Sequence, residues 1–185
     1  MPPRAVLKVA MSGDRQRFEA LALPHMDAAY NLARWLAGSQ ADAEDVVQEA
    51  MLRAFKAFDG FRGDSAKAWL LTIVRNCWRN RLADQRRRAQ APLDAEDGDR
   101  PLVFDGPDPE AEALRASDRR RLDAIIAGLP AEFREVLILR EMEDLSYREI
   151  AEATGAPIGT VMSRLARARA LLKDQWLAKD CDVVP

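Results

Sequence analysis

The chain has 185 residues, of which 48% are hydrophobic and 31% charged, and a formal net charge of −2. This composition is typical of globular proteins, and the length allows one ordinary domain or two small ones. One histidine and two distant cysteines are too few for a zinc site, and no apolar run reaches the length of a signal-peptide core or a membrane span. We therefore expect a cytoplasmic protein without a metal or other cofactor.

The N-terminal half predicts three helical segments. Apolar residues recur at helical spacing over residues 14–36, and a Gly-Ser pair ends this segment. A second helix is expected over residues 41–58. A turn follows, in which Asp64 or Ser65 can cap a third helix that ends in a run of arginines. No segment shows sustained period-two alternation, so we expect an all-α fold.

The composition changes over residues 89–110, where prolines and glycines recur and acidic residues outnumber the single arginine. A loop of this length is unusual inside one compact domain, so we expect an extended acidic linker between two helical domains. The apolar residues 102–104 lie within this linker and can either pack on a neighbouring domain or bind in a groove of a partner. Helices are expected again over residues 111–127 and 131–143.

Residues 146–169 predict a helix-turn-helix. Ser146 can cap the first helix, and Glu149, three residues later, completes a capping box. Gly155 suits the left-handed conformation that ends this helix, and Pro157 stands where the second helix opens. The second helix of such a motif enters the major groove of DNA.

The outward positions of the second helix carry hydrogen-bond donors. Val161 and Leu165 are spaced to pack this helix on the first, and no acidic residue occurs over residues 156–172. Hydrogen-bond donors at these positions can bind phosphates and base edges of DNA. The alternative interpretation is an ordinary amphipathic helical hairpin. The outward polar residues are Thr160, Ser163, Arg164 and Arg167.

With this motif, two blocks nearer the N-terminus complete a resemblance to a known family. The blocks are ADAEDVVQEAMLRAF at residues 41–55, and FRGDS with WLLTIVRN within residues 61–76; LPAEFREVL at residues 129–137 leads into the helix-turn-helix. In this order they resemble the extracytoplasmic-function group of bacterial sigma-70 factors. The resemblance implies a region 2 helical bundle over residues 14–88, an extended linker over 89–110 and a region 4 helix-turn-helix domain over 111–177.

The resemblance implies that the helix expected over residues 41–58 binds RNA polymerase core, at the clamp helices of the β′ subunit. It also implies contacts between this protein and the β subunit. A stripe of carboxylates can meet basic clamp residues, whereas an ordinary solvated face is the alternative for any one of them. The residues expected at this interface are Asp42, Glu44, Asp45, Gln48, Glu49 and Arg53.

Family members also capture an unstacked base of the promoter minus-ten element at the third helix and the loop before it. An amide such as that of Asn76 can donate and accept on a Watson–Crick edge. Arginines of this helix can follow phosphates, or can simply match the dipole at the helix C-terminus. The residues expected here are Phe61, Arg62, Asp64, Arg75, Asn76 and Arg79.

The resemblance assigns the minus-thirty-five element to the second helix of the helix-turn-helix. Thr160 is expected at a phosphate near the helix start, and Arg148 of the preceding helix at the DNA backbone. Serine and arginine further along the helix are expected at bases or phosphates. The full set is Arg148, Thr160, Ser163, Arg164 and Arg167.

These features predict an alternative sigma factor that directs promoter-specific transcription initiation and is controlled by an anti-sigma factor. No nucleophile with a base and no phosphate-binding loop indicates an enzyme. A stand-alone helix-turn-helix regulator would leave the blocks at residues 41–55 and 61–76 without a purpose. A sigma-like decoy that binds an anti-sigma factor would usually lack the arginines in the second helix of the helix-turn-helix, whereas this chain has them.

Overall fold

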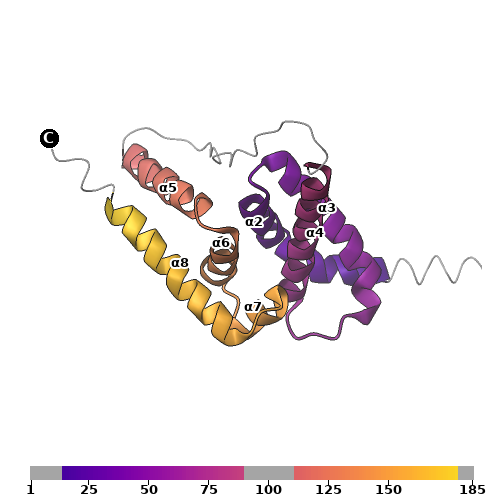
Figure 1. Cartoon of the computed structure of the whole chain (residues 1–185). Coiled ribbons are helices and arrows are strands. Elements are labelled where there is room, and N and C mark those ends of the chain that lie inside the picture. The colour runs from indigo at the N-terminus through magenta and orange to yellow at the C-terminus, as the bar shows by residue number, and fades with distance from the viewer. Residues whose placement is uncertain (1–13, 90–110, 179–185) are drawn as a thin grey trace, which may run out of the picture.

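The computed structural model describes residues 14–89 and 111–178, and every regular element within these ranges is helical, as predicted (Figure 1). The predicted linker lies outside the described residues, apart from its first residue, which ends a helix. None of the described helices is long and apolar enough to cross a membrane. After a helix over residues 14–22, the elements are η1 (Leu23–His25), α2 (Met26–Ala37), α3 (Gln40–Ala57), η2 (Phe58–Gly60), α4 (Ala66–Ala89), α5 (Ala111–Ala127), α6 (Ala131–Leu137), η3 (Ile138–Met142), α7 (Tyr147–Thr154) and α8 (Ile158–Ala178).

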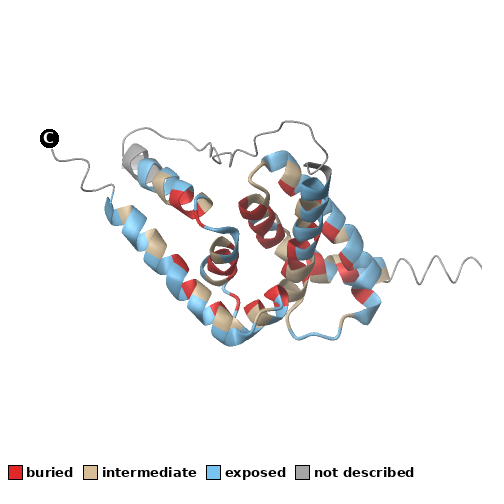
Figure 2. Ribbon diagram, viewed as in Figure 1, coloured by how far each residue is buried: buried red, intermediate tan, exposed pale blue. Residues whose placement is uncertain are grey.

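The N-terminal bundle consists of α2, α3 and α4, which pack on one another. Gly38 ends α2 in the left-handed conformation with φ of 75°. Ser39 caps α3, since its hydroxyl accepts a hydrogen bond from the amide of Asp42 at 3.1 Å. Ser65 caps α4 in the same way, by accepting from the amide of Ala68. Each of these helices carries buried residues (red in Figure 2), and the buried aliphatic ones include Leu32, Val46, Leu70, Leu71 and Val74.

The C-terminal unit confirms the predicted helix-turn-helix. The Ser146 hydroxyl accepts from the amide of Glu149, and the Glu149 carboxylate accepts from the amide of Ser146, which completes the capping box at the start of α7. Gly155 ends α7 with φ of 66°. The next helix, α8, then packs on α7 and α6 through the buried side chains of Val161 and Leu165.

Two segments differ from their predictions. The segment expected over residues 14–36 is divided by η1, at the start of which stands a proline, a residue that cannot donate a helical hydrogen bond. The segment expected as a helix over residues 131–143 is α-helical only to Leu137 and continues as a π-helical turn, in which the amide of Glu143 donates to the carbonyl of Ile138 at 3.1 Å. The Glu143 side chain is buried, and its carboxylate lies 2.9 Å from Nζ of Lys67 in α4. Helical periodicity could not predict this turn, because the partner of Glu143 lies 76 residues away in the chain.

The two units pack against each other, with α6 and α7 between α4 and α8 (Figure 1). At this junction the guanidinium of Arg75 in α4 forms an ion pair with Glu135 of α6, and the two side chains are only 7% and 6% exposed. The same guanidinium donates to the carbonyl of Ala153 in α7 at 3.1 Å. Buried charges are stable only when they are paired and hydrogen-bonded, so these contacts fix how α4 meets α6 and α7.

We predict that Glu135→Ala strongly destabilises the fold, because it leaves the Arg75 guanidinium buried without its carboxylate. Removing one partner of a buried pair costs about 3–5 kcal/mol in free energy of unfolding. Urea denaturation followed by circular dichroism measures this change. The matched control is Glu132→Ala on the same helix, which breaks an exposed pair with Arg164 and should cost less than about 1 kcal/mol. Equal unfolding midpoints for the two variants would contradict the prediction.

Candidate nucleic-acid interface

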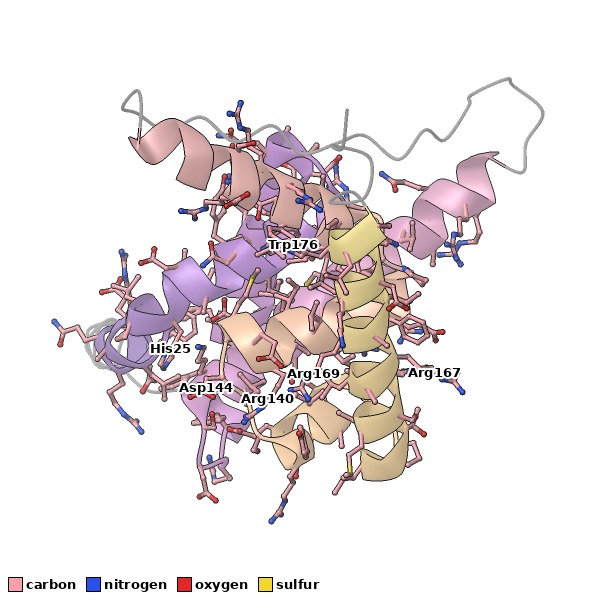
Figure 3. The ribbon with its side chains drawn as sticks, turned by 90° about the vertical axis from the view of Figure 1, so that its left-hand side faces the viewer. His25, Arg140, Asp144, Arg167, Arg169 and Trp176 are labelled. Carbon is pink, nitrogen blue, oxygen red and sulfur yellow. The ribbon has the colours of Figure 1, made fainter. Side chains whose placement is uncertain are left out.

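Three of the side chains predicted for the minus-thirty-five element are accessible. Ser163 and Arg167 are exposed on the outer face of α8, and Figure 3 shows Arg167 pointing away from the rest of the protein. Arg148 is exposed on α7, where its guanidinium donates to the Glu152 carboxylate at 3.1 Å. Arg148 is held only by a solvent-exposed pair, and the Ser163 hydroxyl donates to a carbonyl of its own helix, so these exposed side chains can still exchange their partners for a DNA duplex.

Thr160 and Arg164 are less accessible than the sequence predicts, because each directly precedes a buried residue of α8 and both are half-buried themselves. The guanidinium of Arg164 donates to Glu132 of α6 at 3.0 Å. The carbonyl of Thr160 accepts a hydrogen bond from the Ser163 hydroxyl at 3.0 Å. Both positions thus lie at the edge of the face that packs inward, rather than at the centre of the outer face.

A cavity of about 630 Å³ lies at the loop before α4 and contains the predicted loop residues Phe61, Arg62 and Asp64. The ring of Phe61 rests on Trp69, with 4.8 Å between the ring centroids. Arg62 donates to the carbonyl of Asp59 at 2.7 Å, which holds its guanidinium against the loop. The helix α7 closes the opposite side of the cavity with Arg148, Glu149 and Glu152.

The predicted α4 residues do not join the loop residues in this cavity. Asn76 is exposed, but it lies one turn beyond Thr72, the last residue of α4 that lines the cavity. Arg75 is buried against Glu135, so contrary to prediction it is not accessible to DNA in this arrangement. Its partner comes from the other unit, which the pattern of a single helix cannot reveal.

Arg79 lines a second groove, of about 520 Å³, between α4 and the C-terminal helices. Arg86 of α4 and Arg164 of α8 line the same groove, together with the carboxylates of Glu132 and Glu135. Arginines from both units therefore line the same groove, and its two carboxylates reduce the positive charge of these arginines. Among the described residues, no group of three or more histidine, cysteine, aspartate or glutamate side chains is placed to hold a metal ion.

The residues predicted to bind polymerase lie on α3, where most of them are exposed. Asp42 is the exception, since its carboxylate accepts from the Ser39 hydroxyl at 2.7 Å and pairs with Arg81 of α4 at 2.6 Å. Asp45 shares the same guanidinium at 3.1 Å. Asp42 thus joins α3 to α4. The exposed members of the set are Glu44, Asp45, Gln48, Glu49 and Arg53.

Two apolar side chains on the same helix are not among the residues predicted for this interface. Leu52 and Phe55 are large, hydrophobic and exposed. Leu52 continues the row of Glu44 and Gln48 at intervals of four residues, which was the signal that it shares their face. Exposed apolar side chains beside charged ones are typical of a protein–protein interface.

The chain is similar to two parts of one protein family. The family Sigma-70 region 2 matches residues 21–88, and the family Sigma-70, region 4 matches residues 119–172. RNA polymerase sigma-H factor of Pseudomonas aeruginosa is 38% identical over 164 residues, which cover 85% of this chain and 84% of that protein. ECF RNA polymerase sigma-E factor of Escherichia coli K12 is 34% identical over 172 residues and 90% of each chain. ECF RNA polymerase sigma factor SigE of Mycolicibacterium smegmatis is 36% identical, and the chain spans only 62% of its length.

Solved structures of sigma factors are also similar to this chain. The sigma factor RpoE of Bartonella quintana, in complex with the anti-sigma factor NepR, matches with a TM-score of 0.69 and 27% identity, over 87% of this chain and 97% of that one. CnrH, in complex with the cytosolic domain of CnrY, matches with a TM-score of 0.63 and 27% identity, over 95% and 97% of the two chains. Both alignments are long enough to include helices of both units.

The capping box at the start of α7 makes the stability of the helix-turn-helix depend on pH. The hydroxyl and then the amide of Ser146 hold the pKa of Glu149 below its ordinary value of 4.5. A carboxylate with a lowered pKa contributes stability that is complete above its unfolded-state pKa and is lost as the pH falls through the folded-state pKa. We therefore predict that Glu149→Gln is less stable than the wild type at neutral pH by about 0.3–1 kcal/mol, because the amide can still accept from Ser146 but loses the charge that favours these hydrogen bonds and the helix N-terminus.

This difference should shrink as the pH falls below about 4.5, because the wild-type carboxylate then becomes protonated. Thermal unfolding of the two proteins between neutral and acidic pH measures it. Ser146→Ala removes the first of the two donors and should reduce the same pH dependence. A difference between wild type and Glu149→Gln that stays constant across this range would refute the assignment.

Proposed function

Because the chain belongs to the extracytoplasmic-function group of the sigma-70 family, we propose that its two units bind separate parts of a promoter. It is an alternative sigma factor, and such a protein directs RNA polymerase core to promoters. We assign core and minus-ten binding to residues 14–88, an acidic linker to residues 89–110, and minus-thirty-five binding to residues 111–177. The observation that carries this assignment is a capped helix-turn-helix whose second helix keeps Ser163 and Arg167 exposed.

In the proposed complex α8 lies in the major groove of the minus-thirty-five element. Ser163 suits a base edge, and Arg167 suits a phosphate or a guanine. Arg148 of α7 suits the DNA backbone, because an exposed pair with Glu152 is readily exchanged for a phosphate. Thr160 and Arg164 reach DNA only from the edge of the face, and Arg164 does so after releasing Glu132.

The minus-ten element is proposed to place an unstacked base in the loop cavity, against Phe61, Arg62 and Asp64. Asn76 and Arg79 then contact the strand that continues along α4. Since α7 closes one side of the cavity and Arg75 is buried at the junction, this mode of binding requires the two units to separate. Arg75 becomes available to a phosphate only in that separated state.

The packed arrangement is proposed to be the state that an anti-sigma factor stabilises. RpoE of Bartonella quintana and CnrH, which both resemble this chain over its two units, are bound to NepR and to the cytosolic domain of CnrY in their solved structures. A partner that bridges both units would keep the ion pair of Arg75 and Glu135 closed. This chain would then release its promoter-binding surfaces when the partner leaves.

Polymerase core is proposed to bind the exposed side of α3. The carboxylates of Glu44 and Glu49 meet basic groups of the β′ clamp helices, and Leu52 with Phe55 supplies the apolar centre of the interface. The acidity of residues 89–110 supports a path through the basic cleft of the polymerase. The polymerase performs the chemistry, so we assign no catalytic role to this chain and place it in the cytoplasm with its partner.

We predict that Arg167→Ala weakens promoter binding by the reconstituted holoenzyme. If Arg167 contacts a phosphate, all promoter sequences lose affinity together and the salt slope falls by about one; if it reads a base, preference is relaxed at one position at a cost of about 1–3 kcal/mol. Filter binding at several salt concentrations separates these cases. Arg15→Ala is the matched control, since Arg15 is exposed on the helix over residues 14–22, outside both proposed DNA surfaces.

The promoters for this experiment come from transcription with bacterial core polymerase, the purified protein and fragments of the source genome. Start sites that depend on the protein and share two upstream elements support the assignment. Absence of transcripts from a folded protein that binds duplex DNA alone would favour a conventional regulator. Failure to bind polymerase core would favour a decoy that binds an anti-sigma factor.

A further inference from the structure

The outer face of α8 consists of two parallel rows of different chemistry. Ile158, Met162 and Ala166 follow one another at intervals of four residues and form an apolar row, and all three are exposed. The adjacent row, shifted by one residue, contains Ser163 and Arg167. The face that the proposed function places in the major groove is therefore half apolar.

The apolar row is not part of the protein core. The side chains of Ile158 and Met162 are 47% and 52% exposed, whereas Val161 and Leu165, which hold α8 on α7, are almost completely buried. Ile158 and Met162 adjoin in one row, unlike isolated exposed side chains, and so offer an apolar contact to a partner outside the unit, since burying them there would gain free energy. That partner must tolerate the basic, acid-free surface of residues 156–172.

We propose that Met162 reads a thymine in the minus-thirty-five element by contact with its methyl group. The thymine methyl is the apolar group that base pairs present in the major groove, and the N-terminal turns of a recognition helix are the part that reaches base edges. Met162 lies in the second turn of α8, next to Ser163, and its long unbranched side chain adapts to the groove. Ile158 is the first residue of α8, and in the proposed complex this end of the helix lies near the DNA backbone.

Charge favours DNA over a protein as the partner of this row. Residues 156–172 contain no carboxylate, and the Glu132 carboxylate of α6 is already paired with Arg164. Arg167 stands one turn beyond Ser163 in the adjacent row, where it can hold a phosphate. Specificity here would combine a hydroxyl, a cation and an apolar contact, instead of arginine–guanine pairs alone. This inference rests on the proposed binding of α8 to the minus-thirty-five element.

The test uses the holoenzyme of full-length protein and bacterial core polymerase on promoter duplexes in which the minus-thirty-five element is randomised. Sequencing the bound fraction gives the preference at each position. Synthetic duplexes then replace each preferred thymine, one at a time, by uracil, which lacks only the methyl group. For the wild type we expect one such replacement to weaken binding about fourfold, the equivalent of one buried methyl-sized group.

Met162→Ala should bind the thymine duplex about as weakly as the wild type binds the uracil duplex, and it should not distinguish the two. Leu177→Ala is the matched control, because Leu177 is 50% exposed on the same helix but at its opposite end. This control should retain the full difference between thymine and uracil. Equal thermal unfolding of both variants and the wild type excludes a folding defect, since both side chains are exposed.

The proposal is overturned if Met162→Ala keeps the wild-type difference between thymine and uracil, or if no single uracil weakens the wild type. It is also overturned if Met162→Ala binds polymerase core more weakly in the absence of DNA, which would identify the row as a protein-binding surface. A wild-type holoenzyme that selects no sequence in the randomised element would refute the proposed role of α8 itself, which is a separate failure.

Discussion

The buried ion pair between Arg75 and Glu135 is the interaction on which the arrangement of the chain depends. The Arg75 guanidinium joins α4 to α6 through this carboxylate and to α7 through the carbonyl of Ala153. That carbonyl is among the last four of α7, which have no partner inside the helix, and a cation there also meets the negative end of the helix dipole. Lys67 repeats the pattern on the same helix with Glu143. These ion pairs lie beside a hydrophobic core in which buried side chains of both units form one cluster, and the buried charges among them each need a partner.

Ion pairs at the junction are compatible with the proposed separation of the two units. Exposing an apolar surface to water costs free energy whenever the units separate. A charged side chain, by contrast, is stable in the closed junction when it is paired, and in the separated units when water or another charge surrounds it. A phosphate can replace Glu135 beside Arg75, and solvent can replace Glu143 beside Lys67. Packing of the units and the proposed binding to the minus-ten element therefore compete for the same α4 surface, and a partner that favours one state opposes the other.

The difference between what the sequence could and could not predict follows from the range of the interactions. The capping box of Ser146 and Glu149 and the left-handed Gly155 depend on residues within one turn, so the helix-turn-helix was predicted correctly. The burial of Arg75 depends on a residue 60 positions away, and helical spacing alone placed it on the DNA side. The π-helical turn before Glu143 likewise stands beside a long-range contact, the ion pair of Glu143 with Lys67 of α4.

The arginines of α8 show why counting charges overestimates a DNA-binding surface. Arg164 pairs with Glu132, and Arg169 pairs with Glu141 at 3.0 Å on the side of α8 opposite Arg167 (Figure 3). Both carboxylates come from the helical segment that supports α8, so the local sequence of α8 does not reveal them. Affinity for a duplex grows with the number of phosphates neutralised, and few cations of α8 are available for this. Region 4 alone should thus hold DNA weakly, and stable promoter recognition depends on polymerase to present both units together.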